Sequence, residues 1–220
     1  MKDGAYEILV KRYNIDIENL KKKQLNLSKQ LVIKDKIDFQ LTESFGGFCN
    51  MFIKNKILSC VIVCDKNFEI IDRSYSYEKV RFPYLPEFRS YRELPAMINA
   101  FEKLNQKPDV VFIPGEGILH PRLGLASHFS LSTGIPSIGV SNVLIDCEAK
   151  GKEIFKDGKK VGTLLIEKQG SRPLYVSPGN EISIETAKML SEKIIKLPHK
   201  RPEPLHLANK YAKEVRKELD

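Results

Sequence analysis

The chain lacks any apolar run long enough to span a bilayer, because its longest candidate, Ile57 to Cys64, has only the length of a buried strand. The first residues, Met1 to Gly4, lack the apolar core of a signal peptide, so a cytoplasmic location is expected. There is no internal repeat, no low-complexity segment and no linker long enough to force a second domain. With 220 residues, 42% of them hydrophobic, the composition excludes membrane and disordered classes and predicts an ordinary globular fold.

Cysteine and histidine are both scarce, with four residues of each. The cysteines are Cys49, Cys60, Cys64 and Cys147, and the histidines are His120, His128, His199 and His206. Their spacing matches neither a paired CxxC framework nor a zinc-ligand pattern. We therefore expect core thiols in a reducing compartment.

The charge is not of one sign, since 36 Lys and Arg residues stand against 28 Asp and Glu residues, for a formal net charge of +8. Such an excess permits a polyanionic partner, because clustered cations gain free energy by releasing condensed counterions. The run Lys21 to Lys23 is more typical of a solvated helix face than of a binding site.

Apolar residues recur at helical spacing between Ala5 and Ser28, which predicts one or two amphipathic helices. We expect residues 1–35 to form a helical segment packed on the core of a main domain, residues 36–220. Three β-rich runs follow, separated by short polar breaks: Phe48–Ile53, Ile57–Cys64 and Phe68–Tyr77. They predict three consecutive antiparallel strands, and the middle run, apolar on both faces, should be central and covered.

The pattern then alternates between helix and strand. The expected elements are a helix beginning near Pro95, a strand Val110–Ile113, a helix near Leu123–Ser132 and a strand Ser137–Val140. A right-handed crossover between the two strands would pair them in parallel.

The rest of the chain predicts further strands and helices. The expected elements are a hairpin over Glu153–Glu167 turning at Asp157-Gly158, a strand Pro173–Ser177, a helix capped by Ser183 and a last helix to Leu219. The fold class is therefore α/β, with a mixed sheet of three antiparallel strands followed by parallel strands, flanked by helices. This is the order of the ribonuclease H-like fold.

Seven segments, in this order and spacing, resemble the endonuclease V family. They are Arg81-Phe82-Pro83-Tyr84-Leu85-Pro86, Tyr91-Arg92-Glu93, Lys107-Pro108-Asp109, His120-Pro121-Arg122, Gly124-Leu125-Ala126-Ser127-His128, Ile135-Pro136-Ser137-Ile138-Gly139-Val140 and Pro173-Leu174-Tyr175-Val176-Ser177-Pro178-Gly179. The resemblance covers about Phe48 to Pro204.

The resemblance implies a ribonuclease H-like nuclease that recognises deaminated purines, mainly inosine, in DNA or RNA and hydrolyses a nearby phosphodiester with Mg²⁺. Family members insert a loop, here Pro83, Tyr84, Leu85 and Pro86, as a wedge at the lesion. Tyr84 would stack where the base leaves the helix, which offsets the cost of unstacking. The alternative is that Tyr84 is only a packed loop aromatic.

The resemblance also implies carboxylates that converge on a metal ion, because phosphoryl transfer needs charge neutralisation and an activated water. Glu93 keeps the family glutamate and is the expected metal ligand. The family's two aspartates, its lysine and its histidine are replaced at four positions. These positions are Cys49, Pro114, Asn142 and Asn180.

The replacements predict that Mg²⁺ is bound weakly or not at all. Proline has no side-chain oxygen and a thiol is a soft ligand that suits Mg²⁺ poorly. Glu116 could restore a carboxylate only by moving into the position of Pro114, and His120 could assist Glu93. A soft-metal site built from Cys49 and His120 has no support from spacing.

Other residues of the matched segments are candidates for nucleic-acid contacts. Arg122 could hold a phosphate, and the amides of Gly115 and Gly117 could approach a base or a phosphate. Gly139, on the later strand, and Ser141, just after it, are assigned to the same surface. His120 either contacts phosphate or caps the chain that follows it, and at the third glycine position it rules out a dinucleotide-binding motif.

Three hypotheses follow. The first is a monomeric DNA- or RNA-binding protein with lesion recognition partly kept and cleavage lost or weak. The second is an active nuclease with a rearranged site of Glu93 and Glu116, assisted by His120. The third is a protein-interaction module on the same scaffold. No membrane partner is expected.

Overall fold

A mixed sheet runs through the described part of the chain, residues 3–166, 173–196 and 198–219 of this computed structural model. Within these residues nine strands lie in the order β3-β2-β1-β4-β5-β9-β8-β7-β6. The strands are β1 (Ser44–Ile53), β2 (Lys56–Asp65), β3 (Ile70–Lys79), β4 (Val110–Pro114), β5 (Ser137–Ser141), β6 (Glu148–Lys150), β7 (Glu153–Lys156), β8 (Lys159–Ile166) and β9 (Leu174–Asn180).

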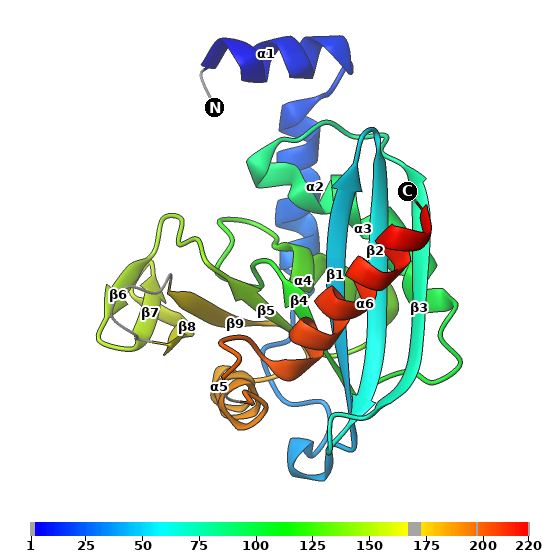
Figure 1. The fold of residues 1–220 in the computed structure, drawn as a ribbon. Helices are drawn as coiled ribbons and strands as arrows, with labels where there is room; N and C mark the ends of the chain where they lie inside the picture. Colours follow the sequence, from blue (N-terminus) through cyan, green and yellow to red (C-terminus); the bar gives the residue numbers. More distant parts are fainter. Residues whose placement is uncertain (1–2, 167–172, 197, 220) are drawn as a thin grey trace.

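Helices cover both faces of this sheet (Figure 1). The α-helices are α1 (Asp3–Arg12), α2 (Ile17–Ser28), α3 (Arg89–Glu102), α4 (Leu125–Thr133), α5 (Ile184–Lys193) and α6 (Glu203–Leu219), and the short 3-10 helices are η1 (Phe39–Leu41) and η2 (Pro86–Phe88). One core lies between the sheet and α3 with α4, and the other lies between the sheet and α5 with α6.

The three antiparallel strands are confirmed. β1 pairs with β2, and β2 pairs with β3, in antiparallel register. Every residue from Ile57 to Cys64 is buried, so the middle strand is covered on both faces as its composition predicts. β1 begins at Ser44, before its apolar run, and β3 begins only at Ile70, because Phe68 lies in the turn with a φ of +66°.

The parallel half of the sheet is also confirmed. β4 pairs in parallel with β1, and β5 pairs in parallel with β4. β9 then joins the other side of β5 in antiparallel register, and β7 and β8 form the predicted hairpin, with Asp157 and Gly158 both at positive φ. Glu167, the predicted end of that hairpin, lies outside the described residues. The fold class predicted from sequence, an α/β mixed sheet, is correct.

The predicted start of the third helix is wrong. α3 begins at Arg89, directly after η2, and contains Pro95 in its interior. Proline is favoured in the first turn of a helix, where its missing amide hydrogen costs little, and that preference misplaced the boundary. Here the rest of the helix, with Leu94, Met97 and Phe101 packed in the core, outweighs the lost hydrogen bond at Pro95.

Gly47 fixes the position of α6 on the sheet. A Cβ atom at this residue would lie 2.1 Å from the carbonyl oxygen of Pro204, so only glycine allows so close an approach. The first turn of α6 therefore lies directly on β1. Through this contact, residues of α6 reach the edge of the sheet at which β1 and β4 end.

The N-terminal helices differ in their contacts. α2 lies beside α4, and its fully buried Gln24 donates a hydrogen bond of 3.0 Å to the carbonyl oxygen of Glu87. α1 extends past the end of the sheet (Figure 1). Among the described residues, no helix combines the length and apolar character that crossing a membrane requires.

Candidate functional site

Glu93, the carboxylate that the sequence predicts as the metal ligand, is buried and already bound. Its side chain is 3% exposed and lies on the inner side of α3. Asn50 of β1 donates a hydrogen bond of 2.7 Å from Nδ2 to Glu93 Oε2. Arg89, one turn earlier on α3, donates from Nε to Oε1 and from Nη2 to Oε2, the second at 3.1 Å.

These contacts neutralise the Glu93 carboxylate inside the protein. Burial alone would lower the pKa of Arg89, but the adjacent Glu93 carboxylate more than offsets it, and the pKa of Arg89 is raised. Arg89 is therefore a permanent cation. It contacts the same oxygens of Glu93 that a metal ion would need. A guanidinium takes the two carboxylate oxygens in a fork geometry, which leaves few lone pairs for a metal.

Cys49 is a neutral thiol that contacts α6. Burial raises the pKa of Cys49 to about 11, against a smaller opposing influence from Arg201 and Lys213. Its Sγ lies 3.7 Å from Oδ1 of Asn209. Because the thiolate is the form that binds metal ions, Cys49 offers no anionic ligand near neutral pH.

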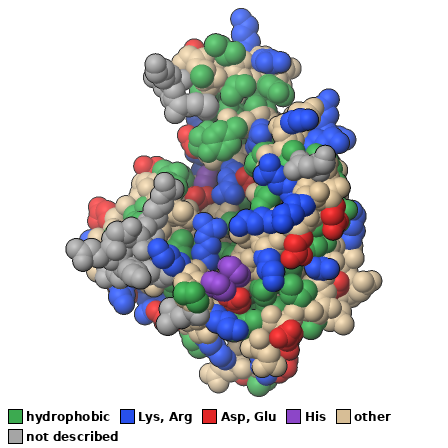
Figure 2. All heavy atoms as spheres, in the orientation of Figure 1, with side chains coloured by type: hydrophobic (Ala, Val, Ile, Leu, Met, Phe, Trp, Pro, Cys, Tyr) green, Lys and Arg blue, Asp and Glu red, His purple; other side chains and the backbone are tan. Residues whose placement is uncertain are grey.

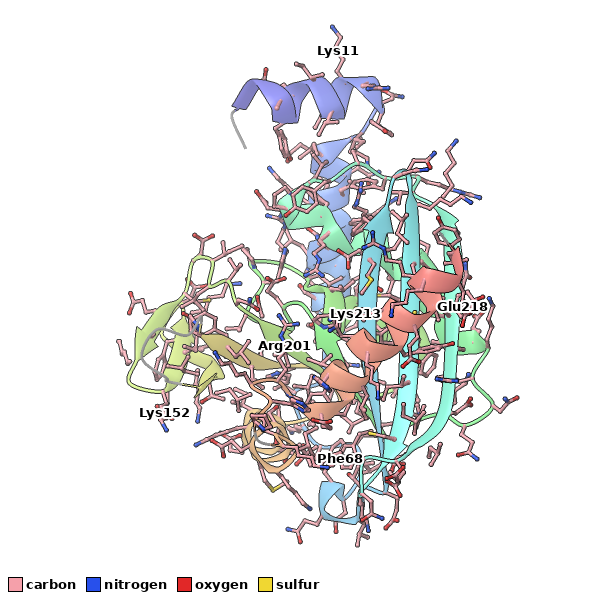
Figure 3. All side chains as sticks on the ribbon, in the orientation of Figure 1. Lys11, Phe68, Lys152, Arg201, Lys213 and Glu218 are labelled. Atoms are coloured by element: carbon pink, nitrogen blue, oxygen red, sulfur yellow. The ribbon has the colours of Figure 1, made fainter. Side chains whose placement is uncertain are left out.

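A cavity of about 480 Å³ opens beside these residues, at the ends of β4 and β5. Its lining residues are Arg89, Pro114, Gly115, Glu116, Val140, Ser141, Asn142, Val143, Arg201 and Leu205. Arg201 lies beside the start of α6, and Lys213 lies further along that helix (Figure 3). Lys and Arg side chains gather across the middle of this face (Figure 2).

Glu116 and Ser141 meet within the cavity lining. The Ser141 hydroxyl donates a hydrogen bond of 2.9 Å to Oε1 of Glu116. The negative charge of Glu116 also acts on Arg89, so the two side chains share one electrostatic environment. Pro114 contributes only ring carbons at this position. Asn142, the replacement for the family lysine, lines the same cavity.

Tyr84 projects from a firmly held loop. Its side chain is 53% exposed, whereas Leu85 is 1% exposed and Pro83 is also buried. Arg92 of α3 donates a hydrogen bond of 2.8 Å to the carbonyl oxygen of Phe82 and so ties the loop to the helix. An exposed aromatic ring on an anchored loop is the geometry that a wedge needs. Pro86, which follows, starts η2 and is exposed.

His120 serves as a cap of the chain that follows it. Its Nδ1 accepts hydrogen bonds from the backbone amides of Arg122, at 3.1 Å, and Leu123, at 3.0 Å. Burial lowers the pKa of His120 to about 4, so the ring is neutral and able to accept both bonds. Of the two alternatives from the sequence, these contacts are those of the capping role.

Arg122 is engaged within the protein. Its Nε donates a hydrogen bond of 2.7 Å to Gln24, and its Nη2 pairs with the Glu87 carboxylate. The guanidinium also lies over the ring of Phe88, 5.3 Å from its centroid. Arg122 thus links α2 to the segment before α3, next to the Tyr84 loop.

The glycines of this region allow backbone segments to approach each other. A Cβ atom at Gly117 would lie 2.1 Å from the carbonyl oxygen of Pro178, and one at Gly139 would lie 2.4 Å from the amide nitrogen of Gly117. The amide of Gly117 donates to Ser177 Oγ at 3.0 Å, and that of Gly115 donates to the carbonyl oxygen of Val140 at 3.0 Å. Both amides are therefore used inside the protein.

Asn180 lies away from the cavity. It pairs with Ser137 at the start of β5, whereas the cavity lies at the other end of that strand, beyond Val140. Its Oδ1 accepts a hydrogen bond of 2.7 Å from the amide of Val32. Asn180 therefore fastens the segment after α2 to the sheet.

Sequence reasoning missed Asn50, Arg89, Arg201 and Asn209. The spacing of four residues between Arg89 and Glu93 carried a usable signal, which was lost when the helix was started at Pro95. Asn50, the neighbour of Cys49, alternates to the opposite face of β1. Arg201 and Asn209 reach the site only because α6 packs on β1, and local sequence carries no sign of that contact.

A model of the endonuclease V family matches residues 25–210 of the chain. The chain belongs to the endonuclease V family. It is 31% identical over 224 residues to the endonuclease V of Thermosipho melanesiensis, a match that covers 96% of this chain and 94% of that relative. It is 35% identical over 208 residues to the endonuclease V of Dictyoglomus turgidum, with 90% of each chain covered.

Solved endonuclease V structures share the fold. The Bacillus subtilis protein superimposes with a TM-score of 0.82 at 25% identity, covering 93% of this chain and 94% of that one. The Ciona intestinalis protein, solved in complex with a 24mer DNA containing an inosine followed by a ribo-adenosine, gives 0.82 at 21% identity, covering 93% and 99%. The resemblance to endonuclease V and the ribonuclease H-like fold are both confirmed.

Proposed function

We propose that this endonuclease V homologue binds nucleic acid containing deaminated bases, with inosine as the main target, and that its Mg²⁺-dependent cleavage is lost or weak. The observation that carries the proposal is the state of Glu93, whose carboxylate is buried and held by Arg89 and Asn50. The protein would act as a monomer on DNA or RNA.

The residues present do not fit the Mg²⁺ ion that the family resemblance implies. Mg²⁺ prefers several oxygen ligands, with carboxylates among them. Of the three family carboxylate positions, Cys49 carries a neutral thiol, Pro114 carries no donor, and Glu93 is paired with a guanidinium. Freeing Glu93 for a metal would leave Arg89 partly buried without its partner, which is costly. We therefore assign no step of catalysis to a metal ion here.

Two residues at this site are suited to binding nucleic acid, Tyr84 and Arg201. Tyr84 is exposed on an anchored loop and can stack on a base or fill the space that a flipped base leaves. Arg201 lies on the wall of the cavity and is exposed, so its guanidinium can contact a phosphate. A Ciona intestinalis relative bound to inosine-containing DNA supports this target class.

The test measures binding and cleavage in the same samples. Fluorescently labelled oligonucleotides with and without one inosine, as DNA and as RNA, are incubated with the chain in Mg²⁺, in Mn²⁺ and in EDTA. We expect tighter binding to the inosine strand, the same affinity with and without metal, and little incision. Robust Mg²⁺-dependent incision that disappears in Glu93→Gln would overturn the inactive assignment.

A rearranged active site is the second candidate, favoured by the presence of Glu116 on the cavity wall. In that case Glu116→Gln would abolish incision as fully as Glu93→Gln. Binding that neither prefers inosine nor weakens with salt would instead favour a protein-interaction role, since phosphate contacts must weaken as salt rises.

A further inference from the structure

His199, Glu203 and His206 bring their ligand atoms together where α6 begins. His199 lies in the loop before α6, Glu203 is its first residue, and His206 follows three residues later. One ligand atom from each side chain lies within 4.8 Å of the other two. His199 Nδ1 is 2.7 Å from Oε2 of Glu203, and the two imidazole rings stack with centroids 3.5 Å apart.

The backbone holds these three residues in place. The amide of Glu203 donates to the carbonyl oxygen of Ile194 at 2.9 Å, and the amide of His199 donates to that of Lys196 at 2.8 Å. Pro204, next to Glu203, packs on Gly47 of β1. The three side chains are therefore held close together, and the two nearly parallel rings must turn for a nitrogen of each to face one ion.

The chemistry of the cluster suits a metal cation. Glu203 is 5% exposed, so its carboxylate has left water and needs a positive partner. Neutral imidazole and ionised carboxylate are the forms that coordinate metals.

We propose that His199, Glu203 and His206 form a binding site for Zn²⁺ or a similar transition-metal ion. Two imidazole nitrogens and one carboxylate oxygen form a donor set that favours Zn²⁺ over Mg²⁺, and this set is also found in zinc sites with an open position. The two histidines line a cavity of about 320 Å³ together with Lys200, Arg201, Leu205 and Asn209, so a fourth ligand would be a water or an anionic oxygen from this side. The site is distinct from Glu93 and stands whether or not the chain binds inosine.

Local sequence carries only a faint sign of this site. The four histidines show no zinc-ligand spacing with the cysteines, and the carboxylate between His199 and His206 completes the set only when the loop folds back on α6. Among the described residues, this is the cluster in which three such side chains converge closely enough for one ion.

The experiment uses the full untagged chain. Zn²⁺ binding is measured by isothermal titration calorimetry, and Co²⁺ binding by visible absorption with Zn²⁺ as competitor. We expect one ion per chain, no competition from excess Mg²⁺, and a loss of affinity of at least about 10-fold in both His199→Gln and His206→Gln. Lys217→Ala, on the same helix, exposed and about three turns beyond His206, is the matched control and should bind like the unsubstituted chain.

A second readout needs no substitution. In an NMR titration, the imidazole signals of His199 and His206 should shift at one equivalent of Zn²⁺, while those of buried His120 and half-buried His128 should not. The proposal is overturned if no saturable binding occurs, if both glutamine variants bind normally, or if the shifted signals belong to the other histidines. It is equally overturned if Cys147→Ser or Cys49→Ser abolishes binding.

Discussion

Arg89 holds Glu93 from one helical turn away, with Nη2 of the guanidinium 3.1 Å from Oε2 of the carboxylate. Asn50 binds the same oxygen from β1. The side chain that a metal ion would need is thus satisfied by the protein itself. This ion pair is neutral overall and is part of the packing of α3, so under the proposed function the contacts that stabilise the fold also withhold the Glu93 carboxylate from a metal ion.

Replacing Arg89 by leucine should destabilise the protein, because it leaves the buried Glu93 carboxylate without its cation. We expect a decrease of about 2–4 kcal/mol in the free energy of unfolding, measured by urea denaturation. The double variant Arg89→Leu with Glu93→Leu should recover part of this loss. Lys21→Ala, which breaks an exposed pair with Glu18, is the control and should cost less than about 0.5 kcal/mol. Equal losses of unfolding free energy in Arg89→Leu and Lys21→Ala would contradict the interpretation.

Replacing Tyr84 by alanine should weaken nucleic-acid binding and leave stability nearly unchanged. Stacking of a base on an aromatic ring contributes about 1–3 kcal/mol, so the dissociation constant for inosine oligonucleotides should rise by roughly 5- to 100-fold. Fluorescence anisotropy measures the change, and Tyr84→Phe should bind normally. Tyr13→Ala removes a similarly exposed ring directly after α1 and serves as the control. Unchanged affinity in Tyr84→Ala would mean that the ring is only a loop aromatic.

Arg201→Ala should lower nucleic-acid affinity in a salt-dependent manner. If Arg201 contacts one phosphate, the slope of log affinity against log salt concentration should decrease by about 1. The comparison is with Lys22→Ala on the exposed face of α2, away from the cavity. A parallel loss at every salt concentration, with the slope unchanged, would show that Arg201 makes no phosphate contact.

Stability should decrease as the pH falls from 6.5 towards 4. Burial lowers the pKa values of His120 and His128 from 6.5 to about 4, so between these values the unfolded chain binds more protons than the folded one. The contribution is complete above pH 6.5 and is lost as the pH falls towards the folded pKa. In His128→Gln the slope of unfolding free energy against pH should decrease by about one proton over this range. Identical slopes for the unsubstituted chain and His128→Gln over this range would refute the prediction. Above pH 7.5 the slopes of the two proteins should agree.

Much of the architecture is readable in the amino-acid order. The fully apolar run Ile57–Cys64 becomes the strand that is buried on both faces, and Ser183 caps α5 by accepting a hydrogen bond from the Thr186 amide. Asp157-Gly158 turns the β7–β8 hairpin. These features depend on interactions between near neighbours, whose residue preferences are expressed in the local sequence. The misplaced start of α3 shows where a local preference, that of proline for a first turn, is overruled by packing.

By itself the sequence determined the fold class and the family, and it predicted that Cys49 and Pro114 replace two acidic side chains of that family. Only the tertiary structure decided which side chains meet: a guanidinium and an amide on Glu93, an asparagine of α6 beside Cys49, and two histidines with Glu203 at the start of that helix. The reason is physical. Backbone preferences act over a few residues, whereas these contacts join segments as far apart as Cys49 and Asn209, and only the packing of α6 on β1 brings such side chains together.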